Sequence, residues 1–223
     1  MFMMVLIIAA FALTIWAQFR VKGTFKKWAQ VPATSGLTGY QAARRMLDNN
    51  GLHHIPIEPV PGSLTDHYDP INRVVRLSEP VYYENTISAI SVACHEVGHA
   101  IQHSVSYPFL VARHRIFPIV NFASGIAPFL LIGGFIFNAF GLIGLGIIFF
   151  SVAVAFQLIT LPVEFNASNR ARSLMITEGF VHQEEAKGVA KVLNAAALTY
   201  VAAALLSLLE LIRYILMFTQ NRE

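Results

Sequence analysis

The sequence predicts an integral-membrane protein that is mainly α-helical, with about four transmembrane helices and a small α+β portion outside the bilayer. Its 223 residues are 55% hydrophobic and only 13% charged, and the mean hydropathy is +0.55. The apolar residues are concentrated in three blocks without charge, at residues 1–19, 116–163 and 192–209. A buried helical core in a soluble protein is the alternative, but charge-free stretches of this length would aggregate in water.

These blocks place four membrane helices in order along the chain. About 20 apolar residues cross the hydrocarbon core, so the 48 residues of the middle block are long enough for two spans and a turn. We therefore expect transmembrane helix 1 at 1–19, a transmembrane hairpin (helices 2 and 3) at 116–163 that turns near 138–141, and transmembrane helix 4 at 195–217. The first block has no preceding cations, unlike a signal peptide, so we expect an uncleaved span with its N-terminus outside.

The cationic residues predict the orientation of these helices. Of the 16 Lys and Arg residues, 14 lie within 20–115 and 164–194, and four spans put both segments on one side. The positive-inside rule makes that side cytosolic, which predicts a multi-pass protein of the cytoplasmic membrane. The formal net charge of +3 then reflects membrane orientation, and we expect no nucleic-acid partner because the sequence contains no nucleic-acid-binding motif.

The segment 20–115 carries the signals of a small α+β portion. Thr38 can cap a helix that ends at Gly51. Two strands, at 55–60 and 72–78, are separated by Pro-Gly and Asp-Pro turns. A second helix, capped by Asn85 or Thr86, is expected to run to about 103. Between Glu84 and Glu96 lie only 11 uncharged residues, too few to cross a membrane, so this helix is expected in the cytosol near the membrane surface.

This second helix contains the pattern H-E-x-x-H, at His95, Glu96 and His99. Residues four apart project from one helical face, so both imidazoles can reach a single metal ion. Glu96 lies about 100° around the helix and can address water held by that ion without ligating it. Zn²⁺ suits this arrangement, one ion per chain, with Glu96 as general base. The alternative is a helix with two surface histidines; Gly98, which removes bulk beside His99, and the strand-then-helix order favour the metal site.

A third ligand is required, and Glu164 is the best candidate. It is the first charged residue after the hairpin, whose two spans return the chain to the side of His95. Pro162 can start a new helix there, with Glu164 in its first turn. A carboxylate that marks the end of a span is the competing interpretation. The other candidates are Asp66, His67, Asp69, His103, His114 and His182, of which His103 lies a further turn along the motif helix and is expected to be too far away.

Several stretches of the sequence resemble the YugP-like membrane neutral zinc metallopeptidases of bacteria. They read LTDHYDP, VVRLS, ACHEVGHAIQ, LPVEF-x-AS and AAALTYVAAAL, and they extend over nearly the whole chain. The glutamate after a transmembrane hairpin is more distantly similar to the HtpX-type and CAAX prenyl-endopeptidase proteins. The resemblance implies a zincin-like fold for the cytosolic portion, with His95, His99 and Glu164 as zinc ligands and Glu96 as general base.

The resemblance departs from the family patterns at two positions near Glu164. The HtpX-type pattern has Asp where this chain has Ser168, and the YugP-like pattern has Asp where this chain has Asn166. A carboxylate that orients a ligand histidine must then come from elsewhere or be replaced by a hydroxyl. We expect Asn166, two positions along the helix from Glu164, to point well away from the ligand face.

The stretch TDHYDPINRVVRLS has two interpretations. Residues 73–77 could be an edge strand that binds an extended substrate through Val74, Val75 and Arg76, and we favour this for the strand. Asp66 and Asp69 could contact substrate or a second ion, but we favour turn residues that satisfy the backbone. The lone Cys94 is expected to be a packing residue, with metal ligation or redox gating as the alternative.

Together these features predict a membrane-embedded zinc-dependent metalloendopeptidase that hydrolyses peptide bonds of protein or peptide substrates at the cytoplasmic membrane face. The alternative is a zinc-containing membrane scaffold or holdase that does not cleave, which the intact Glu96 argues against. A transporter or channel is disfavoured because only four spans are expected and the charges lie outside them. The sequence does not specify the oligomeric state.

Overall fold

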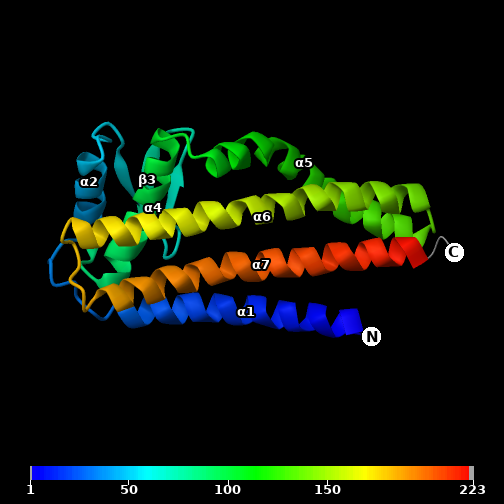
Figure 1. Cartoon of the computed structure of the whole chain (residues 1–223), viewed down its shortest axis with the longest axis horizontal. Helices are drawn as coiled ribbons and strands as arrows, with labels where there is room; N and C mark the ends of the chain where they lie inside the picture. The colour runs from blue at the N-terminus through cyan, green and yellow to red at the C-terminus, as the bar shows by residue number, and fades with distance from the viewer. Residues whose placement is uncertain (1, 221–223) are drawn as a thin grey trace.

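Four long helices run side by side along the molecule in the computed structural model, which describes residues 2–220 (Figure 1). They are α1 (Phe2–Trp28), α5 (Pro108–Ile136), α6 (Phe140–Thr177) and α7 (Ala186–Gln220). Each is long and apolar enough to cross a membrane. The start of α1, the end of α7 and the α5–α6 turn lie at one end of this bundle, and the smaller elements gather at the other.

The long helices extend beyond the expected spans at the end where the smaller elements lie. The 38 residues of α6 correspond to roughly 57 Å of helix, about twice the thickness of a hydrocarbon core. Its charge-free part ends at Val163, so the segment from Glu164 onward continues past that thickness. Pro162 lies inside α6, so the expectation that it starts a new helix is wrong: the helix continues although proline provides no backbone donor there.

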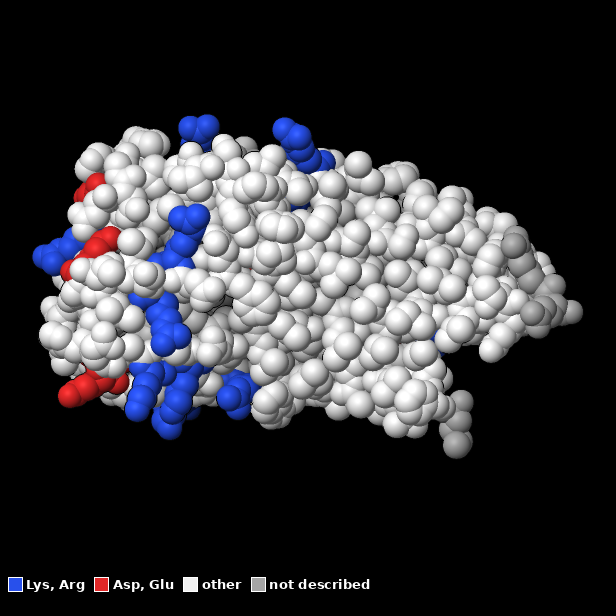
Figure 2. Space-filling view, in the orientation of Figure 1, with Lys and Arg blue, Asp and Glu red and all other residues white. Residues whose placement is uncertain are grey.

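Charged side chains gather at the end that carries the smaller elements. In the view of Figure 2, lysines, arginines and acidic residues cover that end, and most of the remaining length is uncharged. Large apolar side chains on the helices are exposed there, including Phe2, Phe122, Phe129 and Ile148. An apolar surface of this extent is expected where lipid, rather than water, is the surrounding solvent.

The smaller elements form a mixed α and β unit. They are α2 (Gly39–Asn49), β1 (Ile57–Val60), β2 (His67–Asp69), β3 (Val74–Ser78), α3 (Glu79–Tyr83) and α4 (Ile87–Ser104). Thr38 caps α2 in a reciprocal pair with Gln41. Thr86 caps α4 by accepting a hydrogen bond from the amide of Ala89. The predicted helices, caps and two strands are therefore confirmed here.

The three strands form one sheet in the order β1-β3-β2. β1 pairs with β3 in parallel, with Ile57 opposite Val75. β2 pairs with β3 in antiparallel, with Tyr68 opposite Val75. The expectation that residues 73–77 form an edge strand is wrong, because β3 is the central strand and both of its edges are paired.

The helix α4 is the centre of the unit. Fourteen of its 18 residues are buried, and it packs against α2, the sheet, α6 and α7. Gly98 lies at the crossing of α4 with α6: a Cβ atom there would be 2.7 Å from the carbonyl oxygen of Ala167. Glycine therefore lets the two helix backbones approach closely, and this approach brings the face of α4 with the motif against α6.

Candidate metal centre

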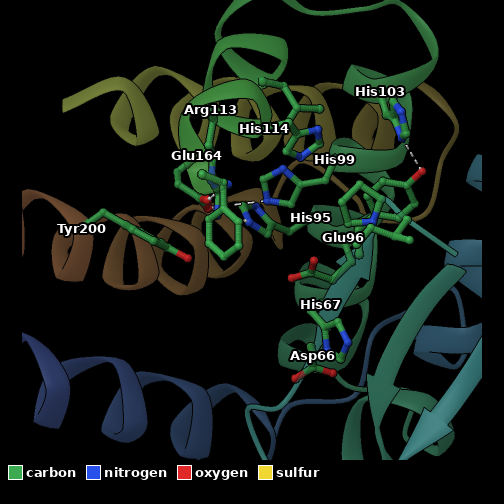
Figure 3. Close-up of a pocket in the computed structure, with 15 residues that line it drawn as sticks. Asp66, His67, His95, Glu96, His99, His103, Arg113, His114, Glu164 and Tyr200 are labelled. Carbon is green, nitrogen blue, oxygen red and sulfur yellow. Dashed lines mark hydrogen bonds and ion pairs between the residues drawn. The ribbon is translucent and has the colours of Figure 1, made fainter. Parts of the chain in front are cut away.

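His95, His99 and Glu164 meet where α4 crosses α6 (Figure 3). The Nε2 atom of His95 lies 3.3 Å from Oε2 of Glu164, and Nε2 of His99 lies 3.6 Å from the same oxygen. One nitrogen or oxygen atom from each of the three residues lies within 4.8 Å of the others. In the described part of the chain, this is the one group of three or more His, Cys, Asp or Glu side chains arranged to hold a metal ion.

The spacing and chemistry of these atoms fit a zinc ion. In a tetrahedral site with metal–ligand bonds of roughly 2.0–2.1 Å, neighbouring ligand atoms lie about 3.3 Å apart. The Oε2 atom of Glu164 is buried and has no hydrogen-bond partner, although two ring nitrogens face it. A buried acceptor without a donor is rare in proteins, and a cation between the oxygen and the two nitrogens would satisfy all three atoms.

Gln102 fixes the orientation of His99. Its side-chain oxygen lies 3.0 Å from Nδ1 of His99. Its side-chain nitrogen donates to the carbonyl of Val163 at 2.8 Å and to Oδ1 of Asn166 at 3.0 Å, which leaves only the oxygen to face the ring. His99 must then donate from Nδ1, so its Nε2 atom carries the lone pair that a metal needs.

Ser168 has the corresponding position beside His95. Its hydroxyl lies 3.1 Å from Nδ1 of His95, and Ser168 stands one helical turn after Glu164 on α6. A hydroxyl therefore occupies the place of the carboxylate in the HtpX-type pattern. Asn166, expected to point away from the ligand face, bonds to Gln102, the partner of His99, and also accepts from Arg170 at 2.8 Å.

A cavity of about 520 Å³ opens beside this cluster. Glu96 lines it and is only 8% exposed, and Figure 3 shows its carboxylate directed into the space. The remaining walls come from the β2 region, from α4 and from the long helices α5, α6 and α7. The cluster, a second carboxylate and an open space therefore occur at one place.

The long helices contribute two polar side chains that the sequence did not single out. Arg113 of α5 donates from Nη1 to Oε1 of Glu164 at 3.2 Å. Tyr200 of α7 lines the cavity, and Figure 3 shows its side chain extending into the space beside Glu164. Arg113 lies only three residues before the longest charge-free block, so it looked like one of the cations that flank a span. Tyr200 stands inside a charge-free block and looked like a residue of the span.

The other ligand candidates are not part of this group of three, although His114 of α5 also lines the cavity. His103 bonds to the hydroxyl of Tyr68 at 2.9 Å and contacts the ring of His114; partial burial lowers the pKa of His103. His182 is exposed on the connection between α6 and α7. His67 lines the cavity, but its Nδ1 atom lies 2.9 Å from the carbonyl oxygen of Thr65.

Asp66 and Asp69 act within the β2–β3 region. Asp66 accepts from the amide and hydroxyl of Ser78, and burial raises its pKa. Asp69 accepts from the backbone of the β2–β3 turn and from Arg76, and its bonds from Asn72, chiefly, hold the pKa of Asp69 well below its usual range. Asp69 therefore satisfies turn backbone, as favoured from the sequence, whereas Asp66 binds Ser78 at the end of β3 and also lines the cavity.

The substrate role expected for Val74, Val75 and Arg76 is contradicted by the sheet. Their strand has no free edge to offer a peptide. Val74 and Val75 are buried, and the Arg76 side chain is held by Glu58 and Asp69. Cys94 is fully buried beside His95, and burial raises the pKa of its thiol, which fits the expected packing role.

Comparisons with known proteins identify the family of the chain. Residues 3–219 match the model of the family described as "Putative neutral zinc metallopeptidase". The chain is 63% identical, over 98% of its length, to "Putative membrane protease YugP" of Bacillus subtilis (strain 168), and covers 97% of that protein. No solved structure matches the chain. The match along nearly the whole length shows that the chain belongs to the family of neutral zinc metallopeptidases so described.

Proposed function

We propose that this protein is a zinc-dependent metalloendopeptidase of the cytoplasmic membrane, which hydrolyses peptide bonds of proteins or peptides at the cytoplasmic membrane face. In this proposal His95, His99 and Glu164 hold one zinc ion per chain. The observation that carries the proposal is the convergence of two ring nitrogens on the unpartnered Oε2 atom of Glu164, with the Glu96 carboxylate in the same cavity.

Each residue has a separate task in the proposed reaction. When bound, zinc supplies a more acidic water and a Lewis acid for the scissile carbonyl. Glu96 accepts a proton from the attacking water and returns it to the leaving amine nitrogen. Gln102 keeps His99 in the tautomer that leaves Nε2 free, and Ser168 offers a hydroxyl partner to Nδ1 of His95.

The substrate is proposed to lie along β2. This strand pairs with β3 on one side only, and residues of the β2 region line the cavity: Asp66, His67, Tyr68, Pro70 and Ile71. An extended peptide could add to the free edge by main-chain hydrogen bonds and pass beside the cluster. The apolar side chains of Leu110 and Phe117, from α5, complete that wall.

The proposed arrangement in the membrane follows the distribution of cations. The four apolar helices cross the bilayer as transmembrane helix 1 (1–19), a hairpin (116–163) and transmembrane helix 4 (195–217). The segments 20–115 and 164–194, which hold 14 of the 16 Lys and Arg residues, then face the cytoplasm. The site then lies where the hydrocarbon core meets the cytoplasm, because Glu164 directly follows the charge-free part of α6.

Metal content and cleavage, measured on the same preparations, test the proposal. The purified protein should hold about one zinc per chain by atomic emission, and His99→Ala and Glu164→Ala should lose most of it. His182→Ala, which changes an exposed histidine, is the control and should keep the metal. Full occupancy in both His99→Ala and Glu164→Ala would exclude the ligand assignment.

Glu96→Gln separates metal binding from hydrolysis. It should retain zinc but lower turnover by a factor on the order of 10²–10⁴, because the amide cannot accept the proton. New N-termini in cells that express wild type, compared with cells that express Glu96→Gln, would report the substrates. Zinc-loaded wild type with no cleavage in detergent, in liposomes or in cells would favour the non-cleaving scaffold instead.

A further inference from the structure

Arg113 is the one lysine or arginine among the described residues that line the cavity. It belongs to the second turn of α5, and its Nη1 atom donates to Oε1 of Glu164 at 3.2 Å. The Glu164 side chain is only 4% exposed, whereas that of Arg113 is 29% exposed. The Arg113 side chain therefore extends from the more exposed part of the cavity to the buried carboxylate of Glu164.

The two oxygens of Glu164 have different surroundings. Oε1 accepts from Arg113, while Oε2 has no hydrogen-bond partner and faces the Nε2 atoms of His95 and His99. A carboxylate can bind a metal through one oxygen or through both. A donor on Oε1 turns that oxygen away from the histidines and leaves Oε2 as the single ligand atom.

Arg113 is itself held in place by α6. Its guanidinium lies 5.8 Å from the centre of the Phe156 ring, within the range of a cation–π contact. Phe156 stands two helical turns before Glu164 on the same helix, so the guanidinium is bracketed by two α6 side chains. Its neighbour Arg115 is exposed and does not line the cavity.

We infer that Arg113 is a positioning residue that holds Glu164 as a one-oxygen metal ligand, and so links α5 to the metal centre. This inference rests on the proposed zinc site. With two imidazoles and a single oxygen, a tetrahedral ion keeps its fourth position for water. A second oxygen from Glu164 would compete for that position, so the bond from Arg113 also keeps it open.

Zinc affinity of the full-length protein, measured by competition with a chromophoric chelator, tests this role. Arg113→Met removes the donor and should weaken zinc binding by about 10- to 100-fold, the usual effect of losing a group that orients a ligand. The positive charge of Arg113 also repels a dication, which opposes this effect. The orientation of Glu164 should dominate, because Arg113 bonds directly to Oε1 and the Glu164 side chain is only 4% exposed.

The controls distinguish this role from a simple ion pair between helices. Arg113→Lys keeps a donor to Glu164 and should retain most of the zinc affinity. It also keeps the inference testable if Arg113→Met does not insert into the membrane. Arg115→Met removes the nearby exposed arginine and should bind zinc as wild type does. In a Glu164→Ala background, Arg113→Met should cause no further loss, because both act through the same ligand.

The other possible results separate the role of Arg113 from the proposed zinc site. Unchanged or tighter zinc binding in Arg113→Met, or an equal loss in Arg115→Met, would overturn the role of Arg113 alone. An additional loss in the Glu164→Ala background would show that Arg113 does not act through Glu164. Absence of zinc from the wild-type protein would overturn the proposed function itself.

Discussion

Gln102 illustrates how much a site depends on a side chain that lies outside its cavity. It is fully buried, and its three hydrogen bonds connect His99 of α4 with Val163 and Asn166 of α6. The two bonds donated to α6 decide which end of the amide faces the imidazole. The protonation of His99 at Nδ1 is therefore imposed by α6, the helix that also carries Glu164.

Gln102→Leu should weaken zinc binding, because the leucine has a similar size but no acceptor for Nδ1 of His99. The expected loss in affinity is about 10- to 100-fold. Asn166→Ala should lower the zinc affinity less, because Gln102 keeps its bond to the carbonyl of Val163. Chelator competition on both variants measures the difference, and a larger loss in Asn166→Ala would contradict this order.

The sequence predicted the motif residues better than their supporting side chains. His95, Glu96 and His99 are identified by their spacing on one helix, and Glu164 by its place after a hairpin. Ser168 was noted only as a departure from a family pattern. Gln102 had a usable signal, because it follows His99 by three residues on the same helical face. Arg113 and Tyr200 had none, because residues near or within a span are explained equally well by the membrane.

At the scale of elements, the close crossing of α4 and α6 determines where the ligands meet. Gly98 stands between His95 and His99 in the motif, and its position against the backbone of Ala167 leaves no room for a side chain. The sequence suggested that this glycine removes bulk beside His99. The structure shows that the glycine instead makes room for the backbone of α6 where the two helices cross.

Gly98→Ala should force α4 and α6 apart. The added Cβ would lie 2.7 Å from the Ala167 carbonyl oxygen and 3.2 Å from the Ala167 Cα, and backbone atoms cannot rotate away. Overpacking of this kind typically costs about 1–3 kcal/mol, and we expect a lower melting temperature together with loss of zinc. Gly125→Ala in α5, where nothing lies within 4 Å, is the matched control and should keep both. Normal zinc content in Gly98→Ala would show that the crossing tolerates a wider spacing.

The sheet and α6 show which features a local sequence pattern cannot predict. The pattern of residues 72–78 identified a strand, but it could not reveal that β1 and β2 flank it on both sides. β2 has only three residues, too few for a periodic signal, and its pairing depends on the turn held by Asp69. Pro162 suggested a helix start because proline is common there, whereas neighbouring helices in the bundle support a continuous α6.

For the whole molecule, the separation of charge along the long axis indicates which end carries the larger portion outside the bilayer. Figure 2 shows charged side chains at the end with the smaller elements, and the uncharged α5–α6 turn lies at the other end. Composition alone was enough to predict this division, because it depends on blocks of residues and not on the contacts of any one of them.

Cysteine labelling should establish the orientation of the two ends. In a Cys94→Ala background, Asn138→Cys and Gln220→Cys should react with an impermeant maleimide on intact cells. Lys187→Cys, which is exposed at the opposite end of α7, should react only after the membrane is opened. Gel-shift detection of the label scores both outcomes, and the reverse pattern would place the candidate site outside the cytoplasm.

The passage of the chain through α5 and α6 between His99 and Glu164 has a consequence for biosynthesis. The proposed third ligand follows the second by 65 residues, and the ribosome needs roughly 3–13 s to add them at about 5–20 residues per second. During that interval the nascent polypeptide carries both histidines but no complete ligand set. Glu164 reaches them only when the hairpin has been inserted and the chain has returned. In the proposed arrangement, transmembrane helix 1 anchors the nascent chain first, and the ligand set is completed only after the hairpin has followed it into the bilayer, so a precursor that lacks the hairpin would remain inactive.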